Sequence, residues 1–179
     1  MSDQFSQSSL SNTQLISRTK EKQFLRFYLY PDTKVMLPIR QITEVLKINF
    51  GQIVPIPQMP DWVMGVYNWR GDILWMLDLG HLIGLNSCYH QKVNHSKQTA
   101  IVLSPDKEQV KAKDANNIHL GLVVSQVEDI ELCNREAIQM ATGKISSQLE
   151  PFLQGYWLKP EGDMILVLDG KAIVAAMPK

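Results

Sequence analysis

The sequence contains few cysteines and no excess charge of either sign. Its two cysteines, Cys88 and Cys133, are too far apart for a zinc knuckle or a CxxC redox pair, and too few for a secreted disulfide framework. Eighteen basic and eighteen acidic side chains cancel. This balance argues against a nucleic-acid binder and against electrostatic attachment to anionic lipid. Association with other proteins stays open, because little self-repulsion keeps the molecules apart.

Long apolar runs and targeting signals are also lacking. No window approaches the roughly 18 to 20 consecutive apolar residues of a membrane span, and residues 1–20 contain no signal-peptide pattern. These residues are rich in Ser, Gln and Asn, so we expect a flexible polar tail over 1–20. We therefore expect a cytoplasmic protein with no direct membrane insertion.

Catalytic signatures are missing from the chain. It has no P-loop, no G-x-S-x-G elbow, no H-E-x-x-H motif and no kinase signature set. We therefore expect no enzyme, no catalytic residues and no cofactor. His90 and His95 share a polar segment, but no carboxylate stands at ligand spacing beside them. We interpret them as solvated residues and predict no metal site.

Short apolar runs separated by turn residues fill the chain from Gln23 onward. Their spacing predicts hairpins over 24–40, 65–77 and 155–168, and single strands over 99–103, 118–124 and 127–132. Residues 42–48 fit either a strand or one helical turn, and 137–150 is ambiguous, with room for a short helix. Many short strands and two or three short helices indicate an all-β architecture of sandwich or barrel type.

An internal repeat relates the two halves of the chain. Residues 71–78 (GDILWMLD) align without a gap on 162–169 (GDMILVLD), and two upstream segments recur in the same order. We infer a duplicated β-unit with approximate halves 21–85 and 98–179, a polar linker over 86–97, and strands open to exchange between the halves. The halves should pack together, because each core alone would be marginal. Four aspartates fall at equivalent positions, two in turns and two as helix N-caps: Asp72, Asp163, Asp78 and Asp169.

Arg70 is the side chain that stands out as a binding candidate. It lies at a turn between two apolar strands and is the only Lys or Arg between Lys47 and Lys92. One interpretation is an exposed turn arginine of no consequence. The other is a guanidinium paired with Glu44 and offered to a partner, since arginine suits planar bidentate contacts. Trp69 and Trp75 flank the same turn and are either core residues or part of a binding surface.

Taken in order, the motifs of this sequence resemble the CheW-like domain. The match runs from about Gln23 to the C-terminus, and its two halves agree. The segments that carry it are LPI at 37–39, ITEV at 42–45, VPIP at 54–57, PDWVMGV at 60–66, NWRG at 68–71, LDL at 77–79, GLVV at 121–124 and LVLD at 166–169.

The resemblance implies an all-β fold of two packed SH3-like, five-stranded β-barrel subdomains with short capping helices. It also implies a non-enzymatic adaptor that couples the cytoplasmic tip of methyl-accepting chemoreceptors to a CheA-type histidine kinase. The pathway would be flagellar chemotaxis, pilus motility or phototaxis, with recruitment to membrane receptor arrays. We expect a free-standing adaptor, because the chain ends near Lys179. The alternative from another class is a β-barrel module that binds a small molecule or a metal.

The resemblance also implies a partner-binding surface on the first barrel. Ile42, Gly65 and Arg70 match residues of the family's receptor-facing surface, and Glu44 matches the carboxylate that accompanies the arginine. Trp69 stands where an aliphatic residue is usual and Trp75 where proline is common, so the surface would be reshaped for a particular partner. The predicted receptor-binding residues are Ile42, Glu44, Gly65, Asn68, Trp69, Arg70 and Gly71.

Overall fold

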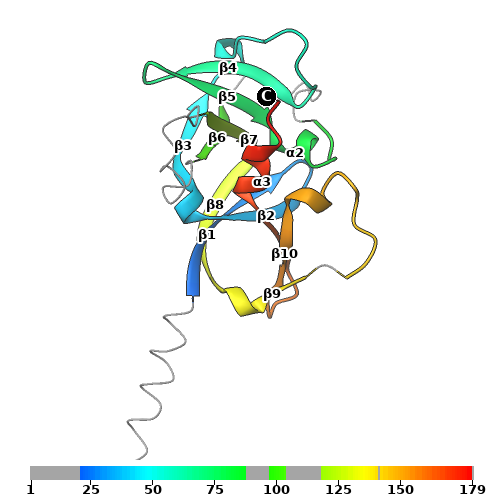
Figure 1. Cartoon of the computed structure of the whole chain (residues 1–179). Coiled ribbons are helices and arrows are strands. Elements are labelled where there is room, and N and C mark those ends of the chain that lie inside the picture. The colour runs from blue at the N-terminus through cyan, green and yellow to red at the C-terminus, as the bar shows by residue number, and fades with distance from the viewer. Residues whose placement is uncertain (1–20, 88–96, 104–117, 141, 179) are drawn as a thin grey trace, which may run out of the picture.

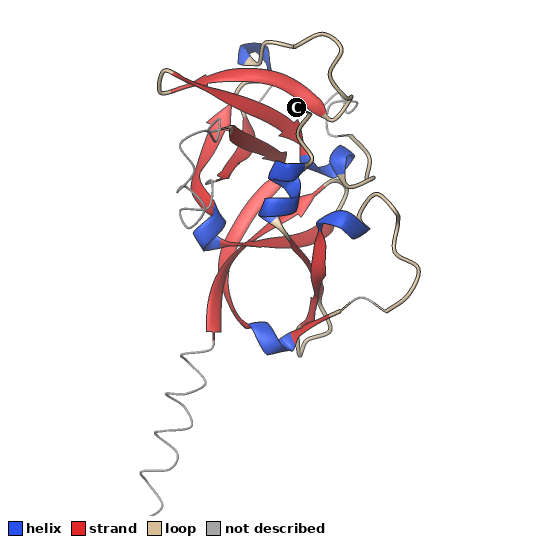
Figure 2. Cartoon of the chain, in the orientation of Figure 1, coloured by secondary structure: helices blue, strands red, loops and turns tan. Residues whose placement is uncertain are grey.

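The computed structural model describes residues 21–87, 97–103, 118–140 and 142–178. The predicted tail over 1–20 lies outside these ranges, as do Cys88, His90, His95 and most of the linker 86–97. The described residues form one five-stranded and one six-stranded β-sheet with short helices (Figures 1 and 2). The all-β class expected from the sequence is confirmed.

The first sheet has five strands and lies in the upper half of Figure 1. Neighbouring strands are antiparallel, except that its third and fourth strands run parallel. The order across the sheet is β3 (Ile42–Ile48), β6 (Gln98–Leu103), β7 (His119–Val124), β5 (Asp72–Asp78) and β4 (Val63–Trp69).

The second sheet repeats this arrangement, including one parallel pair, β11 with β2. A two-residue sixth strand, β9, adds to the five strands expected. The order is β8 (Gln126–Asn134), β1 (Glu21–Leu29), β2 (Thr33–Pro38), β11 (Met164–Leu168), β10 (Leu153–Leu158) and β9 (Ile138–Gln139). Each sheet thus takes strands from both halves of the chain: β1 and β2 of the first half belong to the second sheet, whereas β6 and β7 of the second half belong to the first.

Three apolar clusters form the core. The largest lies between the sheets, and each sheet also encloses a smaller cluster of its own. Strand β7 shows how one sequence serves both faces: Leu120 and Leu122 enter the cluster between the sheets, while Val123 points into that of the first sheet. A strand buried on both faces reads as a continuous apolar run. Each fully buried aliphatic side chain contributes about 1.5–3 kcal/mol.

Short helices connect the strands. The α-helices are α2 (Leu79–Leu82) and α3 (Gly170–Ala175), and the 3₁₀ helices are η1 (Ile39–Gln41), η2 (Phe50–Gln52), η3 (Arg135–Ala137) and η4 (Glu150–Phe152). Asp78 accepts a hydrogen bond from His81 N at 3.1 Å and Asp169 from Lys171 N at 2.9 Å, which confirms both predicted N-caps. None of the helices in the described ranges is long and apolar enough to cross a membrane.

The two ambiguous segments are settled by their pairing. Residues 42–48 are a strand, because all but one of them pair with β6. The short helix allowed over 137–150 does not form in its described part. There, Ile138 and Gln139 pair with β10 as β9 instead, and 3₁₀ turns stand at either end.

Candidate functional site

A two-residue turn joins β4 to β5 and presents Arg70. Both turn residues have positive φ, 56° at Arg70 and 92° at Gly71, as a type I′ hairpin turn requires. Asn68 Oδ1 accepts a hydrogen bond from Gly71 N at 3.1 Å, which fixes the turn further. The turn therefore holds Arg70 in a defined direction at the tip of the hairpin.

Glu44 joins this turn to the opposite edge of the first sheet. One carboxylate oxygen accepts a hydrogen bond from Trp69 Nε1, and the other lies 2.5 Å from Arg70 Nη2. The Arg70 guanidinium carbon also lies 5.4 Å from the centroid of the Trp69 ring. Because β3 and β4 are the two edge strands of the sheet, these contacts draw its edges together. We call Glu44, Trp69 and Arg70 the Glu44 cluster.

Exposure separates the roles of the three side chains. Trp69 is 9% exposed, packs in the core cluster of the first sheet and makes an edge-to-face contact with His119 at 5.1 Å. The side chain of Glu44 is 21% exposed and that of Arg70 is 69% exposed. The structure thus confirms the pairing of Arg70 with Glu44 and places Trp69 in the core, so Arg70 is the member that faces solvent.

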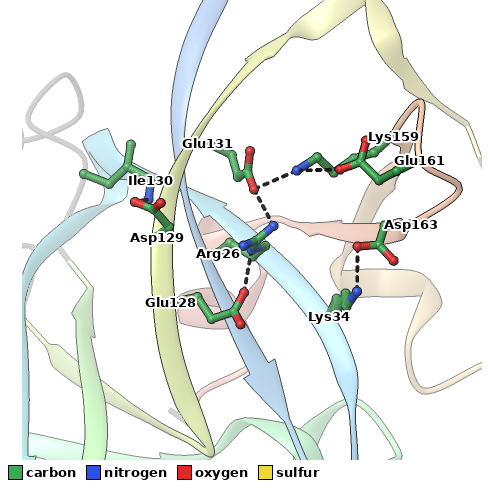
Figure 3. A network of polar contacts seen from close by, with 9 residues as sticks. All are labelled: Arg26, Lys34, Glu128, Asp129, Ile130, Glu131, Lys159, Glu161 and Asp163. Carbon is green, nitrogen blue, oxygen red and sulfur yellow. Dashed lines mark hydrogen bonds and ion pairs between the residues drawn. The ribbon is translucent and has the colours of Figure 1, made fainter.

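The second sheet carries a counterpart at its own hairpin (Figure 3). Lys159 is the first residue after β10, a position comparable to that of Trp69 at the end of β4. Its Nζ lies 3.1 Å from a carboxylate oxygen of Glu131 on the edge strand β8. Here both partners are only 16% exposed, and the hydrogen bond to Glu131 raises the pKa of Lys159. Arg26 also pairs with Glu131, at 2.5 Å. This network clamps β1, β8 and the hairpin, and it leaves no exposed guanidinium like that of Arg70.

Two predicted residues lie away from the Glu44 cluster. Ile42 is half-buried and packs against the core between the sheets. Gly65 is buried with a φ of 135°, and a Cβ there would lie 2.2 Å from the carbonyl oxygen of Val54. Its role is a close backbone approach, next to the bridge between Val54 and Val66. The structure brings together Glu44, Asn68, Trp69, Arg70 and Gly71, but not Ile42 or Gly65.

An open apolar groove of about 680 Å³ lies beside the turn. Trp75 forms part of it, and Ile73, which is 64% exposed, is its most accessible apolar side chain. An apolar residue on a solvent-facing strand position is a signal that could have identified Ile73 from the sequence. The lining residues are Ile56, Val66, Gly71, Asp72, Ile73, Trp75, Ile118 and His119.

Metal and thiol chemistry receive no support from the described part of the chain. No group of three or more His, Cys, Asp or Glu side chains gathers there in a way that could hold a metal ion. Cys133 is buried, and burial, with smaller contributions from Glu131 and Glu21, raises the pKa of its thiol to about 11. A thiol in this state is not a nucleophile.

The fold and this site define an all-β domain in which an exposed arginine lies beside an open apolar groove. A family model described as the CheW-like domain matches residues 23–177, and the chain belongs to that family. Among solved structures, the chain is similar to the scaffolding protein TtCheW from Thermoanaerobacter tengcongensis. The TM-score is 0.64 at 21% identity, and the match covers 83% of this chain and 89% of that one. The sequence matches no curated protein.

Membership of this family establishes the general role. CheW-like proteins are non-enzymatic scaffolds of chemotaxis signalling. The chain is therefore an adaptor in chemotaxis-type signal transduction rather than an enzyme.

Proposed function

We propose that this chain couples the cytoplasmic tip of methyl-accepting chemoreceptors to a CheA-type histidine kinase, and that the Arg70 turn contacts the receptor. The observation that carries this proposal is the exposed guanidinium of Arg70, held in place by the half-buried Glu44. Arginine fixed in this way can offer its remaining N–H groups to carbonyl or carboxylate oxygens of a partner. The chain would reach membrane receptor arrays through this contact.

The groove beside the turn supports a protein partner. Its apolar lining next to one fixed charge is the combination that recognises an amphipathic helix, with apolar contacts giving affinity and the charge giving orientation. Trp75 and Ile73 enlarge the apolar surface at this place. Partner choice within the family would then depend on the side chains that meet Trp75.

The decisive experiment is retention of the two partners. Purified full-length chain is mixed with a receptor signalling hairpin and with a CheA-type kinase, each from a chemotaxis gene cluster of the same genome, and captured complexes are analysed. We expect both to be retained, and receptor-dependent kinase activity to need the chain. The proposal is overturned if neither the receptor hairpin nor the kinase is retained.

Arg70→Glu tests the receptor-facing turn. The Arg70 side chain is 69% exposed, so loss of its ion pair should cost less than about 1 kcal/mol of folding stability. We expect receptor retention to fall and kinase retention to persist. Arg135→Glu is the matched control, an exposed arginine beside β9 at the far end of the second sheet. Unchanged receptor coupling in folded Arg70→Glu would contradict the role of the turn.

A further inference from the structure

A buried amide joins the C-terminal helix to the start of the strand that carries Glu44. Gln41, the last residue of η1, is 5% exposed, and its Oε1 accepts a hydrogen bond from Gly170 N at 3.1 Å. Gly170 is the first residue of α3. A helix leaves its first N–H groups without backbone acceptors. Asp169 accepts a hydrogen bond from Lys171 N and Gln41 accepts one from Gly170 N, so Gln41 adds a second capping contact to α3 from 129 positions away in the sequence.

The contact is close and its helical side is firmly held. A Cβ built on Gly170 would lie 2.7 Å from Gln41 Oε1 and 3.3 Å from its Cδ, so the amide approaches to a distance that only glycine admits. One turn later, Ile173 is fully buried in the core between the sheets. Because α3 is fixed by this packing, it offers Gln41 a rigid anchor.

The start of β3, by contrast, is weakly held by its own sheet. Ile42 pairs with Leu103 and Glu44 pairs with Val102, so Thr43 is an extra residue in a bulge. Leu103 is the last residue of β6. A single pair therefore holds β3 before the bulge. Bulges redirect the side chains beside them, so the direction of Glu44 depends on what fixes the backbone just before it.

We propose that Gln41 is a positioning residue for the Glu44 cluster. By tying the start of β3 to α3, it sets the direction in which Glu44 meets Trp69 and Arg70. The C-terminal helix and the exposed guanidinium are then coupled, although no contact between them is required. The consequence for receptor binding rests on the proposed function, whereas the coupling itself does not.

The indole N–H of Trp69 is a direct reporter, because it donates to Glu44. Nitrogen-15-labelled full-length protein contains four tryptophans, and loss of one indole signal in Trp69→Phe identifies the Trp69 resonance. Its position in Glu44→Ala marks the state without the acceptor. We expect Gln41→Met, which lacks the accepting oxygen, and Gly170→Ala, which displaces the amide from the opposite side, to shift the resonance toward that position. Gln41→Glu retains an accepting oxygen and should leave the Trp69 resonance at its wild-type position.

Two controls separate positioning from general loosening. The Trp157 resonance, on the second sheet, should stay in place in both variants. Ser87→Ala removes a different contact to a helix cap, the 2.8 Å hydrogen bond to Asp78, and should leave Trp69 unmoved. An unmoved Trp69 resonance in folded Gln41→Met or Gly170→Ala overturns the inference, as does an equal shift in Ser87→Ala. If Gln41→Met fails to fold, Gly170→Ala decides alone, because it displaces the Gln41 amide without changing residue 41. The readout contains no partner, so failure of receptor retention would remove only the proposed function.

Discussion

Glu44 accepts a hydrogen bond from the indole nitrogen of Trp69, a residue on the opposite edge strand of the same sheet. Because Trp69 is a core residue and Glu44 is only 21% exposed, the bond is shielded from water. It therefore serves the fold as well as the surface. The same carboxylate forms an ion pair with the exposed guanidinium of Arg70. The Glu44 side chain therefore joins the core of the first sheet to its exposed turn.

Loss of the Glu44 carboxylate should weaken the fold. We expect Glu44→Ala to lower the free energy of unfolding by about 1–3 kcal/mol, because the indole N–H of Trp69 loses its acceptor. Glu44→Gln retains an oxygen at that place and should cost less. The matched control is Asp129→Ala, on β8, an edge strand of the second sheet, where the exposed carboxylate accepts a hydrogen bond from the next backbone N–H, that of Ile130. Urea unfolding measures all three, and equal losses in Glu44→Ala and Asp129→Ala would contradict the prediction.

Alanine substitutions at three glycines distinguish the cost of a strained backbone conformation from the cost of steric overlap. At Gly71, φ is positive but a Cβ meets nothing within 4 Å, so Gly71→Ala should cost about 1–2 kcal/mol. At Gly65 the Cβ also overlaps the Val54 carbonyl, and the cost should reach about 3 kcal/mol or more. Gly51 has neither feature, and its alanine variant should stay within about 0.5 kcal/mol of wild type. Thermal or urea unfolding gives the ranking, and a Gly65→Ala variant as stable as Gly71→Ala would be inconsistent with the close approach.

The pair between Lys34 and Asp163 predicts a pH dependence. The hydrogen bond from Lys34 holds the pKa of Asp163 below its ordinary value of 3.8, and the same bond raises the pKa of Lys34 above 10.5. A depressed carboxylate pKa stabilises the fold above pH 3.8, and the effect is lost as pH falls through the folded value. A raised lysine pKa stabilises below pH 10.5, and that effect is lost as pH rises further. Asp163→Asn should therefore flatten the stability profile at both extremes.

That profile is measured by urea unfolding from the acid to the alkaline limb. Asp32→Asn, at an exposed position of the β1–β2 turn, is the control. It should leave the free energy of unfolding unchanged at both the acid and the alkaline ends of the profile. Identical limbs in wild type and Asp163→Asn would show that the pair does not contribute.

Cys133 should be unreactive in the folded protein. Its pKa of about 11 against an ordinary 9.0 reduces the thiolate fraction at pH 8 by roughly a hundredfold, and its burial blocks access as well. In a Cys88→Ser background, alkylation of the native chain at pH 8 should be more than roughly a hundredfold slower than in urea. Comparable rates in the two states would mean that the thiol is accessible in the native fold.

The local elements were predictable because their signals are local. Alternation and turn residues located the hairpins, and Asp78 and Asp169 were recognisable as caps ahead of short apolar segments. The pairing of Arg70 with Glu44 followed from the isolated charge and from the family resemblance.

What the sequence did not reveal depends on distant residues. The sequence around Trp69 is the same whether its side chain is buried or exposed. Its burial depends on the contact between the two edge strands of the first sheet, which the sequence does not reveal. Gly65 was grouped with the partner-binding surface, but its requirement for glycine comes from the carbonyl of Val54 on a separate segment. The contact of Gln41 with Gly170 spans 129 positions, and no periodicity marks it.

The interleaving of strands makes the two sheets inseparable. Without β6 and β7, the first sheet has no strands between β3 and β5. Without β1 and β2, the second sheet has none between β8 and β11. A cut in the linker would therefore yield two fragments that each hold incomplete portions of both sheets, and neither would be a folded half. The surface at Arg70 therefore depends on both halves of the chain, because the sheet that carries it combines β3, β4 and β5 of the first half with β6 and β7 of the second.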